Sequence, residues 1–163
     1  MSEVRRFLGD AGLVAARDLR IEFRSRVVVG QVVPFALLVL VLFGFALDAA
    51  HPTLRTFASG LFCVAVLLSA LLAVLRSAAL EQSDGTLDAL RMSGLPPAAL
   101  FIGKATAVFV QLVVLEVVLL GGLLVLYGVQ VVDPALLVVA GLLAGVAVAA
   151  AGTLYGVLAS ELG

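Results

Sequence analysis

Four long apolar stretches, separated by short polar segments, dominate the hydrophobic pattern of the chain. They occupy residues 27–47, 57–75, 98–127 and 134–160, and each contains few or no charged residues. About 20 apolar residues in a helix cross the hydrocarbon core of a bilayer, which is about 30 Å thick. The pattern therefore predicts four transmembrane helices.

Residues 4–26, before the first apolar stretch, repeat apolar and basic positions with the period of a helix. At 100° per residue, one side carries Leu8, Gly12, Ala15, Leu19 and Phe23, and the opposite side carries Arg6, Arg17, Arg20 and Arg24. Such a helix lies flat at the membrane surface, where its arginines suit anionic lipids. Asp10, Asp18 and Glu22 moderate the charge and can pair with arginines of the same helix. It serves either as a simple anchor or as a docking surface for a partner.

A polar segment, 81–97, joins the second and third apolar stretches. Asp84 can accept backbone N–H groups at the start of a helix, and Gly94 can end it. Leu87 and Leu90 give this helix an apolar side. We therefore expect a short capped helix held between two membrane spans, against which a soluble motor protein can push.

Two features inside the spans predict how the helices pack. Pro34 lacks an N–H group and leaves the carbonyl near Gly30 free, which predicts a kink in the first span. The fourth span contains two pairs of glycines at a spacing of four, Gly141 with Gly145 and Gly152 with Gly156. Such pairs allow another helix to approach closely, either within the subunit or between subunits.

Glu116 is the acidic residue of the third span. As a helix, the chain rises about 18 Å from Lys104 to Glu116, which places the carboxyl group near the middle of the bilayer. A carboxylate at that depth is costly and must face protein or water, or be protonated. Its role is either a contact between helices or between subunits, or a place on a substrate or proton pathway. Gln111 is a second intramembrane candidate, on a different side of the helix.

Composition and charge place the chain in a membrane and orient it there. Of the 163 residues, 63% are hydrophobic and 13% are charged, and the mean hydropathy is +1.24, which no soluble domain of this size shows. The formal net charge of −1 says less than the distribution of charges. Nine of the ten Lys and Arg residues lie before the first span or between 76 and 104, and Arg55 alone lies elsewhere. By the positive-inside rule, the N-terminus and the 81–97 segment are cytoplasmic.

The residues needed for enzyme chemistry are missing from the sequence. It has no Gly-x-x-x-x-Gly-Lys-Ser/Thr loop, so ATP hydrolysis is not expected on this chain. His51 and Cys63 are the only residues of their kinds, so neither a catalytic pair, a metal site nor an intramolecular disulfide is expected. The sequence indicates a transporter subunit rather than an enzyme, with no nucleic-acid partner.

Two segments resemble a known family. They are Ala16-Arg-Asp-Leu-Arg-Ile-Glu-Phe-Arg-Ser-Arg26 and residues 68–97, which contain Glu81, then Asp84-Gly85-Thr86-Leu87, then Leu90 and Pro96, with Gly103-Lys104 following. Together they resemble the haem exporter protein B family of cytochrome c maturation, the membrane subunit of an ABC transporter of the ABC-2 class. The resemblance extends from about Val14 to the end of the chain.

The resemblance implies partners and site residues. Residues 81–97 would be the coupling region on which a separate ABC ATPase docks and binds ATP, with the N-terminal helix beside it. Its coupling residues would be Glu81, Asp84, Gly85, Thr86, Leu87, Leu90 and Arg91. The resemblance also implies a homodimer of permeases in the bacterial cytoplasmic (inner) membrane, together with other cytochrome c maturation proteins. The cargo would be haem, or the function a maturation-linked release of haem.

The expected fold is an all-α polytopic membrane domain over 1–163, with an interfacial amphipathic helix and four spans. Members of the class usually carry six spans, so the C-terminal spans are expected to be missing: the chain is either a fragment of a six-span protein or a form in which two spans are dispensable. Two other functions remain open, an ABC-2 permease for a lipid or drug and a membrane scaffold that translocates nothing.

Overall fold

The computed structural model describes residues 2–26, 28–47, 52–83, 96–131 and 133–162, and it is helical throughout these residues except at short connections. The elements, in chain order, are α1 (Ser2–Ser25), the π-helical segment η1 (Val28–Val32), α2 (Val33–Ala46), α3 (Pro52–Ser83), α5 (Pro97–Tyr127) and α6 (Pro134–Leu162). The expected all-α fold is confirmed.

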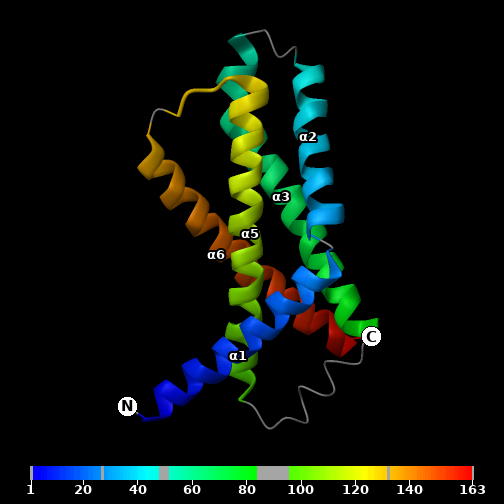
Figure 1. Ribbon diagram of the computed structural model, residues 1–163, viewed down its shortest axis with the longest axis vertical. Coiled ribbons are helices and arrows are strands. Elements are labelled where there is room, and N and C mark those ends of the chain that lie inside the picture. The colour runs from blue at the N-terminus through cyan, green and yellow to red at the C-terminus, as the bar shows by residue number, and fades with distance from the viewer. Residues whose placement is uncertain (1, 27, 48–51, 84–95, 132, 163) are drawn as a thin grey trace.

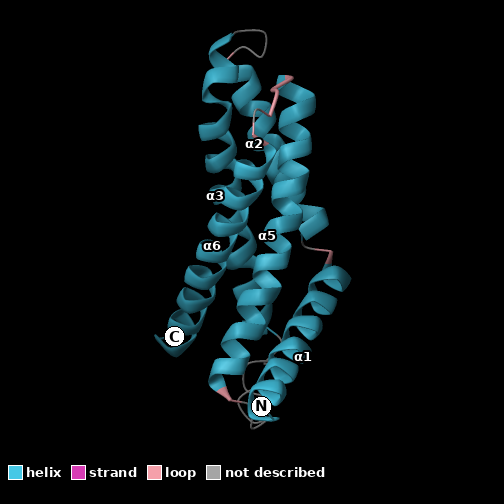
Figure 2. Cartoon of the chain, turned by 90° about the vertical axis from the view of Figure 1, so that its left-hand side faces the viewer, coloured by secondary structure: helices cyan, strands magenta, loops and turns pink. Residues whose placement is uncertain are grey.

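Helices α2, α3 and α5 run alternately up and down along the long axis of the molecule, and α6 returns diagonally across them (Figures 1 and 2). Helix α1 crosses obliquely at the end of the bundle where α3 finishes and α5 begins, and we call this the α1 end. Among the described residues, three helical segments are long and apolar enough to cross a membrane, namely Thr56–Leu75, Pro97–Tyr127 and Pro134–Gly156. A shorter apolar helix, Gly30–Ala46, accompanies them.

The first predicted span is divided in two near its start. The sequence predicted one continuous span over 27–47, whereas the structure has the π-helical turn of η1 (Val28–Val32) followed by α2. Because Pro34 has no N–H group, the carbonyl of Gly30 lacks its α-helical donor, and the backbone just before the proline takes the wider π register. The apolar helix that remains is about 26 Å long, a little less than the hydrocarbon core.

Helix α5 is the central element, because it contacts α1, α2, α3 and α6. Its buried residues are small near the α1 end and large beyond it: Ala99, Gly103 and Ala107, then Leu112, Leu115, Leu119, Leu123 and Tyr127. At 100° per residue the small residues and the leucines lie on roughly opposite sides of the helix. Helix α5 therefore presents one side to α1 and another to the other spans.

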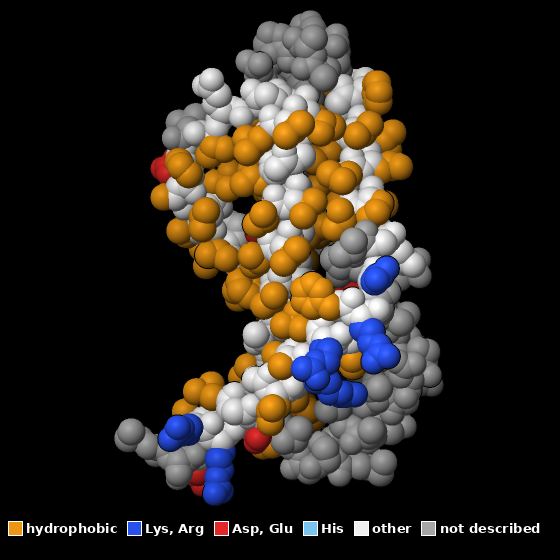
Figure 3. Space-filling view, in the orientation of Figure 1, with side chains coloured by type: hydrophobic (Ala, Val, Ile, Leu, Met, Phe, Trp, Pro, Cys, Tyr) orange, Lys and Arg blue, Asp and Glu red, His pale blue; other side chains and the backbone are white. Residues whose placement is uncertain are grey.

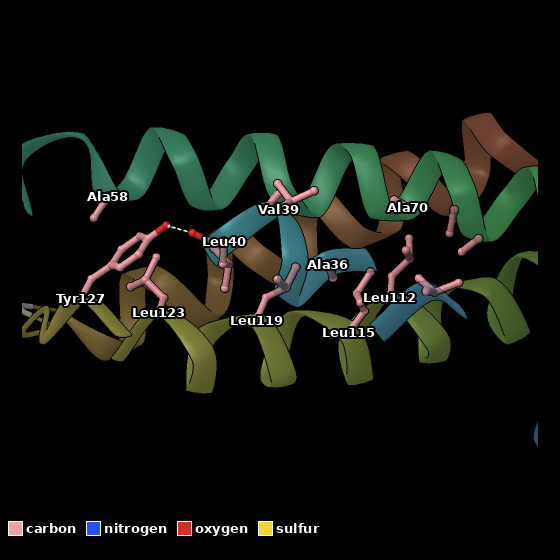
Figure 4. Close-up of a cluster of buried hydrophobic side chains, with 14 residues drawn as sticks. Ala36, Val39, Leu40, Ala58, Ala70, Leu112, Leu115, Leu119, Leu123 and Tyr127 are labelled. Carbon is pink, nitrogen blue, oxygen red and sulfur yellow. Dashed lines mark hydrogen bonds between the residues drawn. The ribbon is translucent and has the colours of Figure 1, made fainter. Parts of the chain in front are cut away.

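The leucine side of α5 forms the main core with α2 and α3 (Figure 4). Helix α3 contributes mostly alanines to this core, including Ala58, Ala65, Ala70 and Ala73, and α2 with the preceding turn contributes Val32, Ala36, Val39 and Leu40. The side chain of Leu40 packs directly over Gly122, where a Cβ would lie 3.0 Å from Leu40 Cδ1. Leucines packed against alanines and glycine bring helices together where lipid offers no hydrophobic driving force.

A hydrogen bond joins α2 and α5 in the half of the bundle away from α1. The hydroxyl of Tyr127 donates to the carbonyl of Leu40 at 2.6 Å (Figure 4). The same ring covers Gly44, where a Cβ would lie 3.3 Å from the ring edge. The phenol therefore satisfies its polar atom in an apolar core, as a buried tyrosine requires.

The connection from α5 to α6 uses two helix caps. Gly128 ends α5 in the left-handed conformation, with φ 59° and its N–H bonded to the carbonyl of Leu124. Asp133 accepts the backbone N–H of Leu136 at 3.0 Å and so caps α6, with Pro134 at its first position. Glycine is the residue type preferred just after a helix, and aspartate followed by proline is preferred where a helix begins.

We expect Tyr127→Phe to destabilise the chain by about 1 kcal/mol, because it removes the hydroxyl and leaves the ring in place. The free energy of unfolding in detergent, followed by circular dichroism, measures this change. Tyr155→Phe is the matched control, since Tyr155 lies on α6 with its side chain exposed. Equal stability of the two variants would contradict a stabilising role for the bond to Leu40.

Candidate functional site

The residues predicted to couple the chain to an ATPase belong to the segment between α3 and α5. The structure places Glu81 in the last turn of α3, which continues without a break from the membrane span to Ser83. The other predicted coupling residues, Asp84, Gly85, Thr86, Leu87, Leu90 and Arg91, lie outside the described residues, as does the predicted capped helix. The site is therefore built from the helices that flank this segment.

Helix α1 lies against the first turns of α5 in a contact at backbone distance. A Cβ added to Gly103 would lie 2.6 Å from Val14 Cβ and 2.8 Å from the carbonyl oxygen of Ala11. No real Cβ fits at these distances, so only glycine allows the helices to cross here. Ala99 and Ala107, one turn before and after Gly103, are also buried.

The side of α1 that contacts protein differs from the predicted apolar side. Ala11, Val14 and Ala15 are buried, whereas Leu8 and Phe23 are 61% and 69% exposed. Among the five residues predicted to form the apolar side, Ala15 alone is buried. Close approach to Gly103 needs small side chains, so α1 turns its small residues toward α5 and keeps its large apolar residues outside.

The charged residues predicted for α1 differ in exposure, because α1 turns its small residues toward α5. Arg20 and Arg24 are exposed and Arg17 is half-buried, but Glu22 is only 9% exposed. Glu22 lies on the same side as the small residues, two turns beyond Ala15. Both Glu22 and Asp18 are engaged in interactions. Glu22 is therefore held inside, whereas Arg20 and Arg24 face outward.

Glu116 lies between α5 and α6 at the first glycine pair of α6. A Cβ on Gly141 would lie 2.9 Å from Glu116 Oε2, and a Cβ on Gly145 would lie 3.6 Å from Oε1. The ring of Phe109 also packs on Gly145, where a Cβ would lie 3.2 Å from Phe109 Cε2. The absence of side chains at both glycines thus makes room for a carboxyl group and a ring from α5.

The second glycine pair of α6 is used only in part. A Cβ on Gly152 would lie 2.8 Å from Val74 Cγ2, so α6 crosses α3 there, while Gly156 meets nothing within 4 Å. Gln111, the other intramembrane candidate, is half-buried. It lies about 140° around α5 from Glu116, so the structure does not bring the two side chains together.

The described part of the chain contains no group of three or more His, Cys, Asp or Glu residues arranged to hold a metal ion. Cys63 is exposed on α3, and His51 lies outside the described residues.

The sequence reasoning missed the α1 contact on α5. A signal for it exists, because Ala99, Gly103 and Ala107 repeat small residues at a spacing of four at the start of the third span. In α6 the same pattern correctly indicated close packing, at Gly141, Gly145 and Gly152.

Gly103→Ala is expected to destabilise the chain by about 1–3 kcal/mol, since the new methyl group forces α1 away from α5. The unfolding temperature in detergent and cross-linking between cysteines introduced on α1 and α5 measure the two effects. Gly121→Ala, on the same helix with nothing within 4 Å, is the matched control. Unchanged cross-linking in Gly103→Ala would show that α1 does not depend on this contact.

In Gly141→Ala, the new methyl group would displace the Glu116 carboxyl group, which can move because it ends a flexible side chain. We expect a small loss of stability, below about 1 kcal/mol, together with a changed distance between α5 and α6. Spin labels on the two helices measure that distance. Gly156→Ala serves as control because its site is open, and the same shift in both variants would exclude a specific role for the carboxyl group.

Comparison with known proteins identifies the chain. The family model of the CcmB protein matches residues 11–163, which include α1 from Ala11 onward and all of α2, α3, α5 and α6. No curated protein and no solved structure matches significantly. The match confirms the resemblance to the haem exporter protein B family and implies association with the CcmA ATPase. The chain therefore belongs to the CcmB family, the permease component of the cytochrome c maturation haem exporter, and is a multi-pass transporter subunit rather than an enzyme.

Proposed function

We propose that segment 81–97 receives the movement of the CcmA ATPase and passes it to α3 and α5. The observation that carries this proposal is that the segment joins two helices which both continue into the membrane, α3 up to Ser83 and α5 from Pro97. A helix transmits displacement along its axis because its backbone hydrogen bonds make it rigid. Force applied to the segment therefore acts on two spans at once.

The contact between α1 and α5 supports this proposal. Ala99 and Gly103 lie within two turns of the start of α5, and α1 packs on them at backbone distance. A displacement of segment 81–97 would move this part of α5 and α1 together. We propose that α1 forms part of the unit that responds to the ATPase, with Arg17, Arg20 and Arg24 on its surface and Glu22 buried within it.

Helix α5 also links the α1 end to the rest of the bundle. It contacts α2 through Tyr127 and Leu40, and α6 through Glu116 and Gly141. ATP-driven closure of the ATPases would favour one arrangement of these helices over another and so change access for haem. Glu116 lies at the contact between α5 and α6, and such a change would alter the packing of its carboxyl group against α6.

The charge pattern and the family support a proposal for the orientation and assembly of the chain. We propose that the α1 end is cytoplasmic, because nine of ten Lys and Arg residues belong to it by sequence. Two permeases would stand on an ATPase dimer in the bacterial inner membrane, near other cytochrome c maturation proteins. Haem would be the cargo moved or released.

Leu87→Asp tests the coupling segment. We expect it to weaken binding to CcmA by roughly 2 kcal/mol, as removal of a central apolar contact does, and to lower stimulation of ATP hydrolysis accordingly. Co-purification and ATPase rates in proteoliposomes measure both effects. Leu136→Asp is the matched control, since Leu136 is exposed in the first turn of α6, at the end of the bundle away from α1.

Three outcomes have distinct meanings in this experiment. Loss of binding in Leu87→Asp alone supports coupling through 81–97. An ATPase rate that is the same in both variants and the unaltered protein contradicts it. Binding without any stimulation in the unaltered protein favours a scaffold that recruits the ATPase and translocates nothing.

A further inference from the structure

The connection from α1 to η1 contains an unfavourable backbone conformation. Arg26, directly after the end of α1, has φ 55°, in the left-handed region. Among the residues that the structure describes, it is the one non-glycine residue with a positive φ. A Cβ disfavours this conformation roughly five- to thirtyfold relative to the right-handed one, so a helix that ends in this way usually has glycine at the position. Arg26 therefore needs an interaction elsewhere to hold it there.

Hydrogen bonds hold Arg26 to the helix on either side. Its N–H donates to the carbonyl of Glu22 in α1 at 3.2 Å, and its carbonyl accepts the N–H of Gly30 in η1 at 2.7 Å. The chain changes direction between α1 and α2 (Figures 1 and 2). This change of direction thus occurs where the left-handed residue lies, between two hydrogen-bonded helical segments.

The packing of α1 on α5 can offset the unfavourable conformation. Among the described elements, α5 is the main neighbour of α1, and Val14 lies directly over Gly103. Helix α2 is held separately, by its core contacts with α3 and α5 and by the bond from Tyr127 to Leu40. Helix α1 is therefore fastened to α5 rather than to α2, the helix that follows it in the sequence.

The side of α1 away from α5 is open. Leu13 and Phe23 are 71% and 69% exposed, and a Cβ on Gly12 would meet nothing within 4 Å. Figure 3 shows basic and hydrophobic side chains along the outer side of α1, which no described part of the chain covers in this view. A Cβ on Gly30, in η1, would also meet nothing. The described residues thus leave room for α1 to turn away from α5.

We propose that Arg26 is a two-position hinge for α1. Its left-handed conformation is present while α1 packs on Gly103. When this contact is lost, Arg26 takes the right-handed conformation that its side chain favours, and α1 turns away from α5 toward the direction of α2. The inference rests on the proposed function only for what drives the hinge, which is the displacement of segment 81–97.

Distances measured in the full-length chain, without the ATPase, test the hinge. Spin labels replace Leu8 on α1 and Leu42 on α2, which are both exposed, and Cys63→Ala removes the native thiol. If α1 and α2 formed one continuous helix, the two labels would be about 50 Å apart along its axis. The bent arrangement gives a shorter distance. We expect Gly103→Ala to shift the population from the shorter distance toward the longer one.

The residue at position 26 should set the balance between the two distances. In the Gly103→Ala chain, we expect Arg26→Gly to raise the ratio of the bent form to the extended form roughly five- to thirtyfold, because glycine adopts a positive φ freely. Arg26→Ala is the matched control. It removes the same charge but keeps the Cβ, so the ratio should stay close to that of arginine.

Two results would overturn the hinge. The first is an equal ratio in Arg26→Gly and Arg26→Ala, because the backbone conformation would then have no influence. The second is a Gly103→Ala chain that keeps only the short distance, whether or not α1 leaves α5. Neither result involves the ATPase. A working hinge in a chain that does not stimulate CcmA would instead contradict the proposed function and leave the hinge in place.

Discussion

The close packing of one helix on another at glycine, where a neighbouring side chain or backbone fills the place of the missing side chain, is the interaction on which the rest of this structure depends. In a bilayer, apolar side chains gain little by leaving lipid for protein, so helices associate where their backbones come close and pack well. The contact of α1 on α5 uses Gly103, that of α2 on α5 uses Gly122, and that of α6 on α3 uses Gly152. The joint of α5 and α6 uses Gly141 and Gly145. Each of these crossings is sited where one helix lacks a side chain.

Helix α5 gains its central place because these contacts are spread around it. Its small residues near the α1 end receive α1, its leucines receive α2 and α3, and the side with Glu116 receives α6. A permease must change shape while its helices remain packed. A single continuous helix that contacts all the others allows a movement at one end to be shared, and the polar group at Glu116 marks the contact least like a purely apolar core.

Much of this arrangement could be predicted from the sequence, because length, hydropathy and helix caps are local properties. The three long spans, the irregular helix before Pro34 and the use of Gly141, Gly145 and Gly152 followed from them, whereas the first span is shorter than predicted. The rotation of α1 could not be predicted in the same way. Its apolar residues suggested a side centred on Leu8 and Phe23, but the side that packs was decided by Gly103, far away in sequence. The burial of Glu22 has the same origin.

The contact between Val14 and Gly103 has a consequence for how the protein is made. Almost ninety residues separate the two positions, and at about 5–20 residues per second their synthesis takes roughly 5–20 s. During that interval α1 exists without its partner helix, and Ala11, Val14 and Ala15 cannot yet pack on α5. Helix α1 can dock on α5 only after α2, α3 and the start of α5 have been synthesised. Although α1 is synthesised before α5, it therefore reaches its final position only after the start of α5 has been made.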